Sequence, residues 1–94
     1  MARLGASNNS NLELGVSYRD IGLVKEALEE FKQAIDDPDA APVARYHIAL
    51  CEADLGQRAA ARATLNQLLS DPGISLNSEL LQAANEKLAE LGQD

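Results

Sequence analysis

Apolar and small residues recur along the first part of the chain at the spacing of one helix face. The first predicted helix carries Leu12, Leu14, Gly15, Tyr18 and Ile21. Gly22 ends it, because glycine adopts the left-handed conformation of a helix C-terminus at little cost. Ser10 with Glu13 is one candidate capping box at its start, and Asn8 is the alternative N-cap. A second helix, stopped by Pro38, carries Val24, Ala27, Leu28, Phe31, Ala34 and Ile35.

The same organisation follows in the next part of the chain. Pro42 suits the first turn of a third helix, and Gly56 ends that helix. Its predicted apolar positions are Ala44, Tyr46, Ile48, Ala49, Leu50 and Leu55. A fourth helix carries Ala61, Leu65, Leu68 and Leu69, and the sequence Asp71–Pro72–Gly73 predicts a turn after it.

A shift of 34 residues aligns the two parts without an insertion. The aligned pairs are Leu14 with Ile48, Gly15 with Ala49, Ile21 with Leu55, Gly22 with Gly56, Ala27 with Ala61, Phe31 with Leu65, and Asp37–Pro38 with Asp71–Pro72. Small residues at the aligned positions let the two helices of a pair approach closely, and Phe31 and Leu65 then fill the space toward the neighbouring pair. A single pair cannot bury its apolar face, so the pairs are expected to stack.

This pattern resembles the tetratricopeptide repeat, whose unit of 34 residues carries W-x2-L-G-x2-Y, then A-x3-F, then P. The first copy matches with Leu14-Gly15-x2-Tyr18, Ala27-x3-Phe31 and Pro38. The second copy is weaker, with Ile48-Ala49, Ala61-x3-Leu65 and Pro72. Asn11 stands at the usual tryptophan of the first copy, and Arg45 and Glu52 replace the two aromatic residues of the second.

The last segment departs from the repeat but keeps a helical pattern, with Leu81, Ala84, Leu88 and Leu91 on one stripe and polar residues behind it. It resembles the capping helix that ends such arrays, with Asn77 or Ser75 as its N-cap. We therefore expect an all-α fold, a short α-solenoid of antiparallel helix pairs with about five helices. The expected divisions are a disordered segment 1–7, repeats 8–41 and 42–75, and a capping helix 76–94.

The resemblance also implies where a partner would bind, because the first helix of each pair lines the concave side of these arrays. The partner-binding residues implied here are Leu12, Val16, Arg19, Tyr46, His47, Leu50 and Ala53. We expect Tyr46 to be central and to contribute little to the core, and Arg19 to hold an acidic group unless Asp20 or Asp54 neutralises it. The alternative for Leu12, Val16 and Leu50 is that they are core residues.

Composition and charge narrow the classes of partner. Eight basic and fifteen acidic residues give a net charge of −7, which disfavours nucleic acid and anionic membranes. Chaperone-binding members of the family hold a peptide C-terminus with a clamp of Lys, Asn and Arg, and non-basic residues such as Leu12 and Val16 occupy those positions here. With no signal-peptide pattern and a single cysteine, we expect a cytoplasmic location.

Residues that suggest chemistry have simpler interpretations. His47 has no motif of Ser, Cys or Asp around it, so a structural or solvated histidine is favoured over a catalytic one. Cys51 fits a buried small residue better than a reactive thiol. One acidic group lacks a calcium-binding loop and fits a solvated convex face, namely Glu26, Glu29, Glu30, Asp36, Asp37 and Asp39. We expect no metal, no cofactor and no catalysis.

The sequence therefore predicts a non-catalytic interaction module that binds a peptide segment of another protein in a concave groove. Two alternatives stay open. The chain is a structural scaffold that associates weakly with itself through its N-terminal helix face, or it is a fragment of a longer array. Its affinity for a peptide is expected to be modest because two repeats offer little surface.

Overall fold

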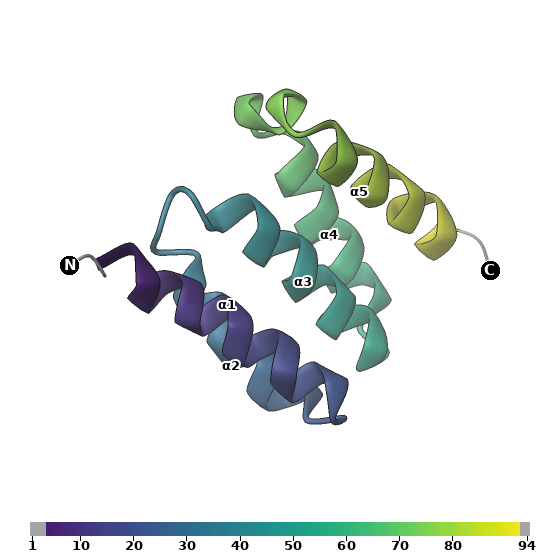
Figure 1. The fold of residues 1–94 in the computed structure, drawn as a ribbon. Helices are drawn as coiled ribbons and strands as arrows, with labels where there is room; N and C mark the ends of the chain where they lie inside the picture. The colour runs from purple at the N-terminus through teal and green to yellow at the C-terminus, as the bar shows by residue number, and fades with distance from the viewer. Residues whose placement is uncertain (1–3, 93–94) are drawn as a thin grey trace.

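The computed structural model describes residues 4–92 and, within that range, side chains from residue 10 onward. These residues form five α-helices and one 3-10 helix, namely α1 (Leu4–Asp20), α2 (Val24–Ala34), α3 (Ala41–Asp54), α4 (Arg58–Leu69), η1 (Pro72–Leu76) and α5 (Ser78–Leu91). The helices lie side by side from α1 to α5, with the start of α1 and the end of α5 at opposite sides (Figure 1). The predicted all-α solenoid of helix pairs is confirmed.

In each pair, one glycine turn joins the two helices, and the two turns are alike. Gly22 and Gly56 have φ values of +89° and +80°, in the left-handed region where a side chain would strain the backbone. After each glycine, the next amide donates to a carbonyl five residues back, from Leu23 to Tyr18 and from Gln57 to Glu52, at 2.8 Å in both cases. The two turns therefore have equivalent geometry, as the aligned glycines predict.

Close packing within each pair depends on matched residue sizes. Gly15 of α1 lies directly against Phe31 of α2, because a Cβ added at Gly15 would lie 2.5 Å from Cε1 of Phe31. The aligned residues of the second pair are Ala49 and Leu65, and both are fully buried. A larger residue on one helix is thus accompanied by a smaller one on the other, in both pairs.

Two clusters of buried residues hold the helices together. We call one the N-terminal core, formed by Ala27, Phe31, Ile48 and Cys51. The other, here called the C-terminal core, is formed by Ala49, Ala61, Leu65, Leu68, Ile74, Leu80, Ala84 and Leu91. Helix α3 contributes to both, since Ile48 and Cys51 belong to one cluster and Ala49 to the other.

Polar contacts occur where the repeat pattern lacks its aromatic residues. The Asn11 side-chain amide donates to Oε1 of Glu30 at 2.9 Å and to Oε1 of Gln33 at 3.4 Å, which joins α1 to α2. In the second pair, Oγ1 of Thr64 donates to Oε1 of Glu52 at 2.7 Å. Hydrogen bonds between the helices thus lie at Asn11 and Glu52, two of the positions where aromatic side chains are usual.

The last helix is docked on the second pair. Leu80, Ala84 and Leu91 of α5 are buried in the C-terminal core, as the capping-helix prediction requires. Oδ1 of Asn77 accepts the Leu80 amide at 3.0 Å, so Asn77 and not Ser75 is the N-cap.

The opposite end of α5 is tied to α4. The guanidinium groups of Arg58 and Arg62 donate to the Leu91 carbonyl at 2.6 and 3.0 Å. Carbonyls in the last turn of a helix lack partners within the helix, and cationic donors satisfy them favourably. Both ends of α5 therefore carry specific hydrogen bonds.

Two expected boundaries differ in the structure, namely the start of the first helix and the end of the second. Helix α1 begins at Leu4, so residues 4–7 are helical and not disordered, while residues 1–3 lie outside the described part. Residues 4–20 contain no proline and continue one helix, which places the proposed caps Asn8 and Ser10 inside it. Helix α2 ends at Ala34, before Pro38. The turn expected at Asp71–Pro72–Gly73 is present, because the Ile74 amide donates to the Asp71 carbonyl at 3.0 Å, and it opens the 3-10 helix η1.

Candidate functional site

One face of α3 is bordered by two hollows. Val43, Tyr46, His47 and Leu50 follow the spacing of a single helix stripe. On one side of this stripe, a shallow, open hollow of about 460 Å³ lies between α1 and α3 and is lined by Leu12, Glu13, Val16, Ser17, Val43 and His47. We call it the α1/α3 hollow.

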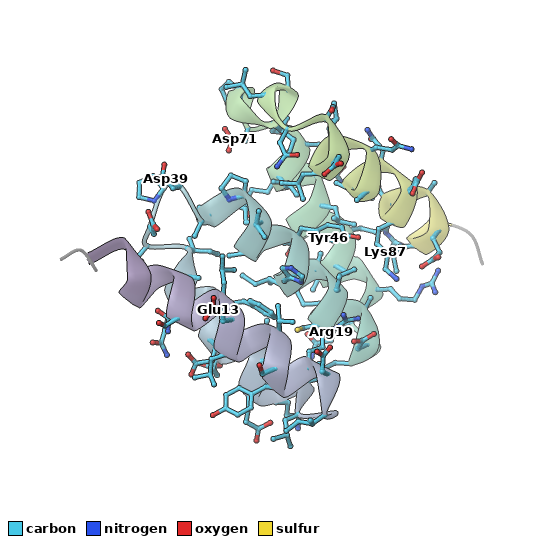
Figure 2. The ribbon with its side chains drawn as sticks, in the orientation of Figure 1. Glu13, Arg19, Asp39, Tyr46, Asp71 and Lys87 are labelled. Atoms are coloured by element: carbon cyan, nitrogen blue, oxygen red, sulfur yellow. The ribbon has the colours of Figure 1, made fainter. Side chains whose placement is uncertain are left out.

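The second hollow lies between α3 and α5 and has a volume of about 230 Å³. Its lining residues are Tyr46, Leu50, Ala83, Glu86, Lys87 and Glu90. Figure 2 shows Tyr46 of α3 beside Lys87 of α5. Glu13 of α1 lies to the left of both in this view. We call it the α3/α5 hollow, and we use the name groove for the two hollows together with the α3 stripe between them.

Ring contacts at His47 connect the groove to the core. The His47 imidazole stacks on Phe31 with a centroid distance of 4.8 Å and an interplanar angle of 13°. Its other aromatic neighbour, Tyr46, meets it edge-on at 5.8 Å. Because Tyr46 lines one hollow and His47 lines the other, this contact makes the two hollows neighbours across α3.

The expected groove residues differ in how far they are buried and in what they pack against. Leu12 is half-buried, packs against the N-terminal core and also lines the α1/α3 hollow. Val16 is 39% exposed and borders the same hollow. Tyr46 packs against the C-terminal core, so the expectation that it contributes little to the core is wrong.

Two further expected residues lie outside the hollow linings. Nε of Arg19 is 2.9 Å from Oδ2 of Asp54, which joins the end of α1 to the end of α3. Arg19 is therefore neutralised by Asp54, the alternative that the sequence left open. Ala53 is half-buried and packs against the C-terminal core.

His47 is an uncharged residue of the groove at neutral pH. Burial, and secondarily the positive charge of Arg19, lowers the pKa of His47 from its ordinary value of 6.5. Its Nδ1 atom is buried without a hydrogen-bond partner in the described part of the chain. A neutral imidazole stacked on Phe31 contributes ring surface to the groove, consistent with the structural role favoured from sequence.

The remaining candidates for chemistry also have structural roles. Cys51 is fully buried in the N-terminal core, and burial raises the pKa of its thiol to about 11. Among residues 4–92, no group of three or more His, Cys, Asp and Glu side chains is arranged to hold a metal ion. Within the same range, no helix combines the length and apolar character needed to cross a membrane.

Several lining residues were not singled out from the sequence. Ser17 lies one turn after Glu13 on α1, while Ala83, Glu86 and Glu90 lie on one face of α5. The signal that predicts the α5 residues is their spacing, because positions 83, 86, 87 and 90 share one face of the helix that caps the second pair.

The comparison with family models matches residues 43–72 to the tetratricopeptide repeat. The matched segment covers most of α3, all of α4 and the turn that follows, which is the copy with the weaker motif in the sequence. No match was found among curated proteins or among solved structures. Domains of this family are protein–protein interaction modules. Residues 43–72 are therefore similar to a tetratricopeptide repeat.

Proposed function

We propose that the chain is a non-catalytic binding module and that a peptide segment of its partner lies in the groove. The observation that carries this proposal is the placement of two hollows on either side of one α3 stripe. A bound segment that crosses α3 at Tyr46 and His47 places side chains in both hollows. Pockets that accept alternate side chains of one segment are a common mode of peptide recognition.

Exposed lining residues support a binding role over a purely structural one. Val16 is 39% exposed beside the α1/α3 hollow, and Leu50 is half-buried beside the other. Neither residue belongs to the buried clusters of the described chain. Apolar side chains that line a hollow without supporting the core are suited to contact a partner.

Selection from a displayed peptide library, followed by titration of the selected peptides, tests the proposal. We expect Val16→Ser and Leu50→Ser each to weaken binding by about fivefold or more, which corresponds to about 1 kcal/mol. Leu76→Ser is the matched control, because Leu76 is 90% exposed on η1 and lines neither hollow. Binding that is insensitive to both groove variants, or a library that gives no binder, contradicts the proposal.

A second candidate function, self-association, has its own observation. In residues 10–92, four of the five exposed large hydrophobic side chains are Leu14, Val16, Ile21 and Leu23. Three of them lie outside the hollow linings, and Ile21 is 71% exposed. If this N-terminal face joins two copies, the mass measured by light scattering should rise with concentration, and Ile21→Glu should abolish the rise. A constant monomer mass excludes this candidate.

A further inference from the structure

The positive charges of Lys87, which lines the groove, and of Arg19, which lies outside its linings, are neutralised by neighbours in the described chain. Arg19 pairs with Asp54 at 2.9 Å, and Nζ of Lys87 pairs with Oε1 of Glu90 at 2.7 Å. The hydrogen bond from Lys87, followed by its charge, lowers the pKa of Glu90. A ligand carboxylate would have to compete with Asp54 or Glu90 for these cations.

Two carboxylates of the groove lack such a cation. Glu13 lines the α1/α3 hollow, and within residues 4–92 it has no ion-pair partner. Glu86 lines the α3/α5 hollow and accepts a hydrogen bond from Nε2 of Gln82 at 3.1 Å, a neutral donor that leaves its negative charge in place. Each hollow therefore carries one carboxylate without a cationic partner, beside a mainly apolar lining in the α1/α3 hollow and a mixed polar and apolar lining in the α3/α5 hollow.

The residues between these two carboxylates do not offset their charge. His47 lies between α1 and the Tyr46 ring and is neutral at pH 7, since its pKa is lowered below 6.5. The whole chain adds a long-range negative field with its net charge of −7. Charges of this arrangement attract cationic groups and repel anionic ones, both during approach and in the bound state.

We propose that the groove selects a basic peptide segment, with apolar side chains for the hollows and a Lys or Arg near each end to meet Glu13 and Glu86. This inference rests on the groove function proposed above and names the class of its ligand. It also reverses the expectation that Arg19 holds an acidic group of the partner. An acidic segment or a free C-terminal carboxylate is disfavoured, because the groove would place it beside an unpaired carboxylate.

The test uses one selected peptide synthesised in three forms, with its apolar centre unchanged and flanked by Lys, by Gln or by Glu. We expect affinity for the chain to fall in that order and the advantage of the Lys form to shrink as salt is raised. The double variant Glu13→Gln/Glu86→Gln should weaken the Lys form about three- to tenfold and leave the Gln form within about twofold.

A matched control separates local charge from net charge. The double variant Glu29→Gln/Asp36→Asn also removes two negative charges, at exposed positions on and just after α2. It should change affinity for the Lys form by less than about twofold. Equal losses in the two double variants, or tightest binding by the Glu form, overturn the charge preference. If the Gln form still binds and depends on Val16 and Leu50, the groove function survives that result. Failure of all three forms overturns both proposals.

Discussion

Gly15 and Phe31 occupy one contact between α1 and α2, where a Cβ on residue 15 would overlap the phenyl ring at 2.5 Å from Cε1. The ring has little room to move, because it is fully buried and also stacks on His47. We expect Gly15→Ala to destabilise the chain by about 1–3 kcal/mol, despite the better helix propensity of alanine. Unfolding in denaturant measures this loss. Gly73→Ala is the control, since a Cβ there meets only Asp71 Oδ1 at 3.6 Å.

The second pair supplies the compensating change. Ala49 and Leu65 stand at the positions aligned with Gly15 and Phe31, so Gly15→Ala/Phe31→Leu copies a combination that the chain already uses. We expect the double variant to be more stable than the sum of the two single losses predicts, by about 0.5–3 kcal/mol. Additive losses would show that the ring does not limit the approach of α1.

Aligned positions in the two pairs differ in what covers them. Leu14 is 42% exposed on α1, whereas its counterpart Ile48 is 5% exposed because the preceding pair packs on α3. Ile48→Ala should therefore cost about 2–5 kcal/mol, and Leu14→Ala less than about 1 kcal/mol. The free energies of unfolding of the two variants make the comparison. Similar costs at both positions would contradict the assignment of Ile48 to the N-terminal core.

The side chain of Asn77 satisfies the Leu80 amide at the start of α5. Asn77→Ala should destabilise the chain by about 0.5–2 kcal/mol, the usual cost of losing an N-cap. Ser75 donates to the Pro72 carbonyl at 3.3 Å on the exposed 3-10 helix, so Ser75→Ala should cost clearly less. Thermal unfolding followed by circular dichroism compares them. A larger loss for Ser75→Ala would mean that the cap of α5 lies elsewhere.

The lowered pKa of His47 predicts a dependence of stability on pH. The unfolded chain binds a proton at this residue near pH 6.5, and the folded chain does so only at lower pH. The unfolded state therefore binds more protons between these two values, so stability falls as pH drops from 6.5 through the folded pKa. The charged form is disfavoured by burial and by Arg19, while Glu13 lines the same hollow.

His47→Phe removes this titration and keeps an aromatic ring against Phe31. Between about pH 7.5 and about pH 5, we expect the melting temperature of the parent chain to fall more than that of the variant. Carboxylates titrate in both proteins, so the difference between the two curves isolates His47. Parallel curves would show that His47 titrates as it does in the unfolded chain.

Features governed by local backbone chemistry could be predicted from the sequence. Gly22 and Gly56 adopt the left-handed conformation that their places after two apolar stripes indicate. Ala27, Ala61 and Phe31 are fully buried, as their alignment across 34 residues predicts. These residues could be predicted because each constrains its own backbone or its own helix pair.

The arrangement of the groove depends on contacts between distant parts of the chain, which the sequence does not specify uniquely. Arg19 had two candidate partners, and the choice of Asp54 over Asp20 follows from the placement of the end of α1 near the end of α3. Tyr46 packs against the C-terminal core and lines the hollow beside α5. The expected continuous strip is therefore divided into two hollows. The start of α1 was missed because its small polar residues carry no apolar periodicity.

Helix α3 belongs to both cores. This shared position has a consequence for partial unfolding of the chain. The C-terminal core joins α3 to α4, η1 and α5, while the N-terminal core is smaller and the outer face of α1 has little cover. Opening is therefore expected to start at α1 and α2, in a fluctuation that leaves α3–α5 assembled and exposes Ile48 and Cys51. Native-state hydrogen exchange should show this as a gradient, with amides of α1 and α2 exchanging well before those of α4. Such an open form would also be the state in which the Cys51 thiol becomes accessible to alkylating reagents.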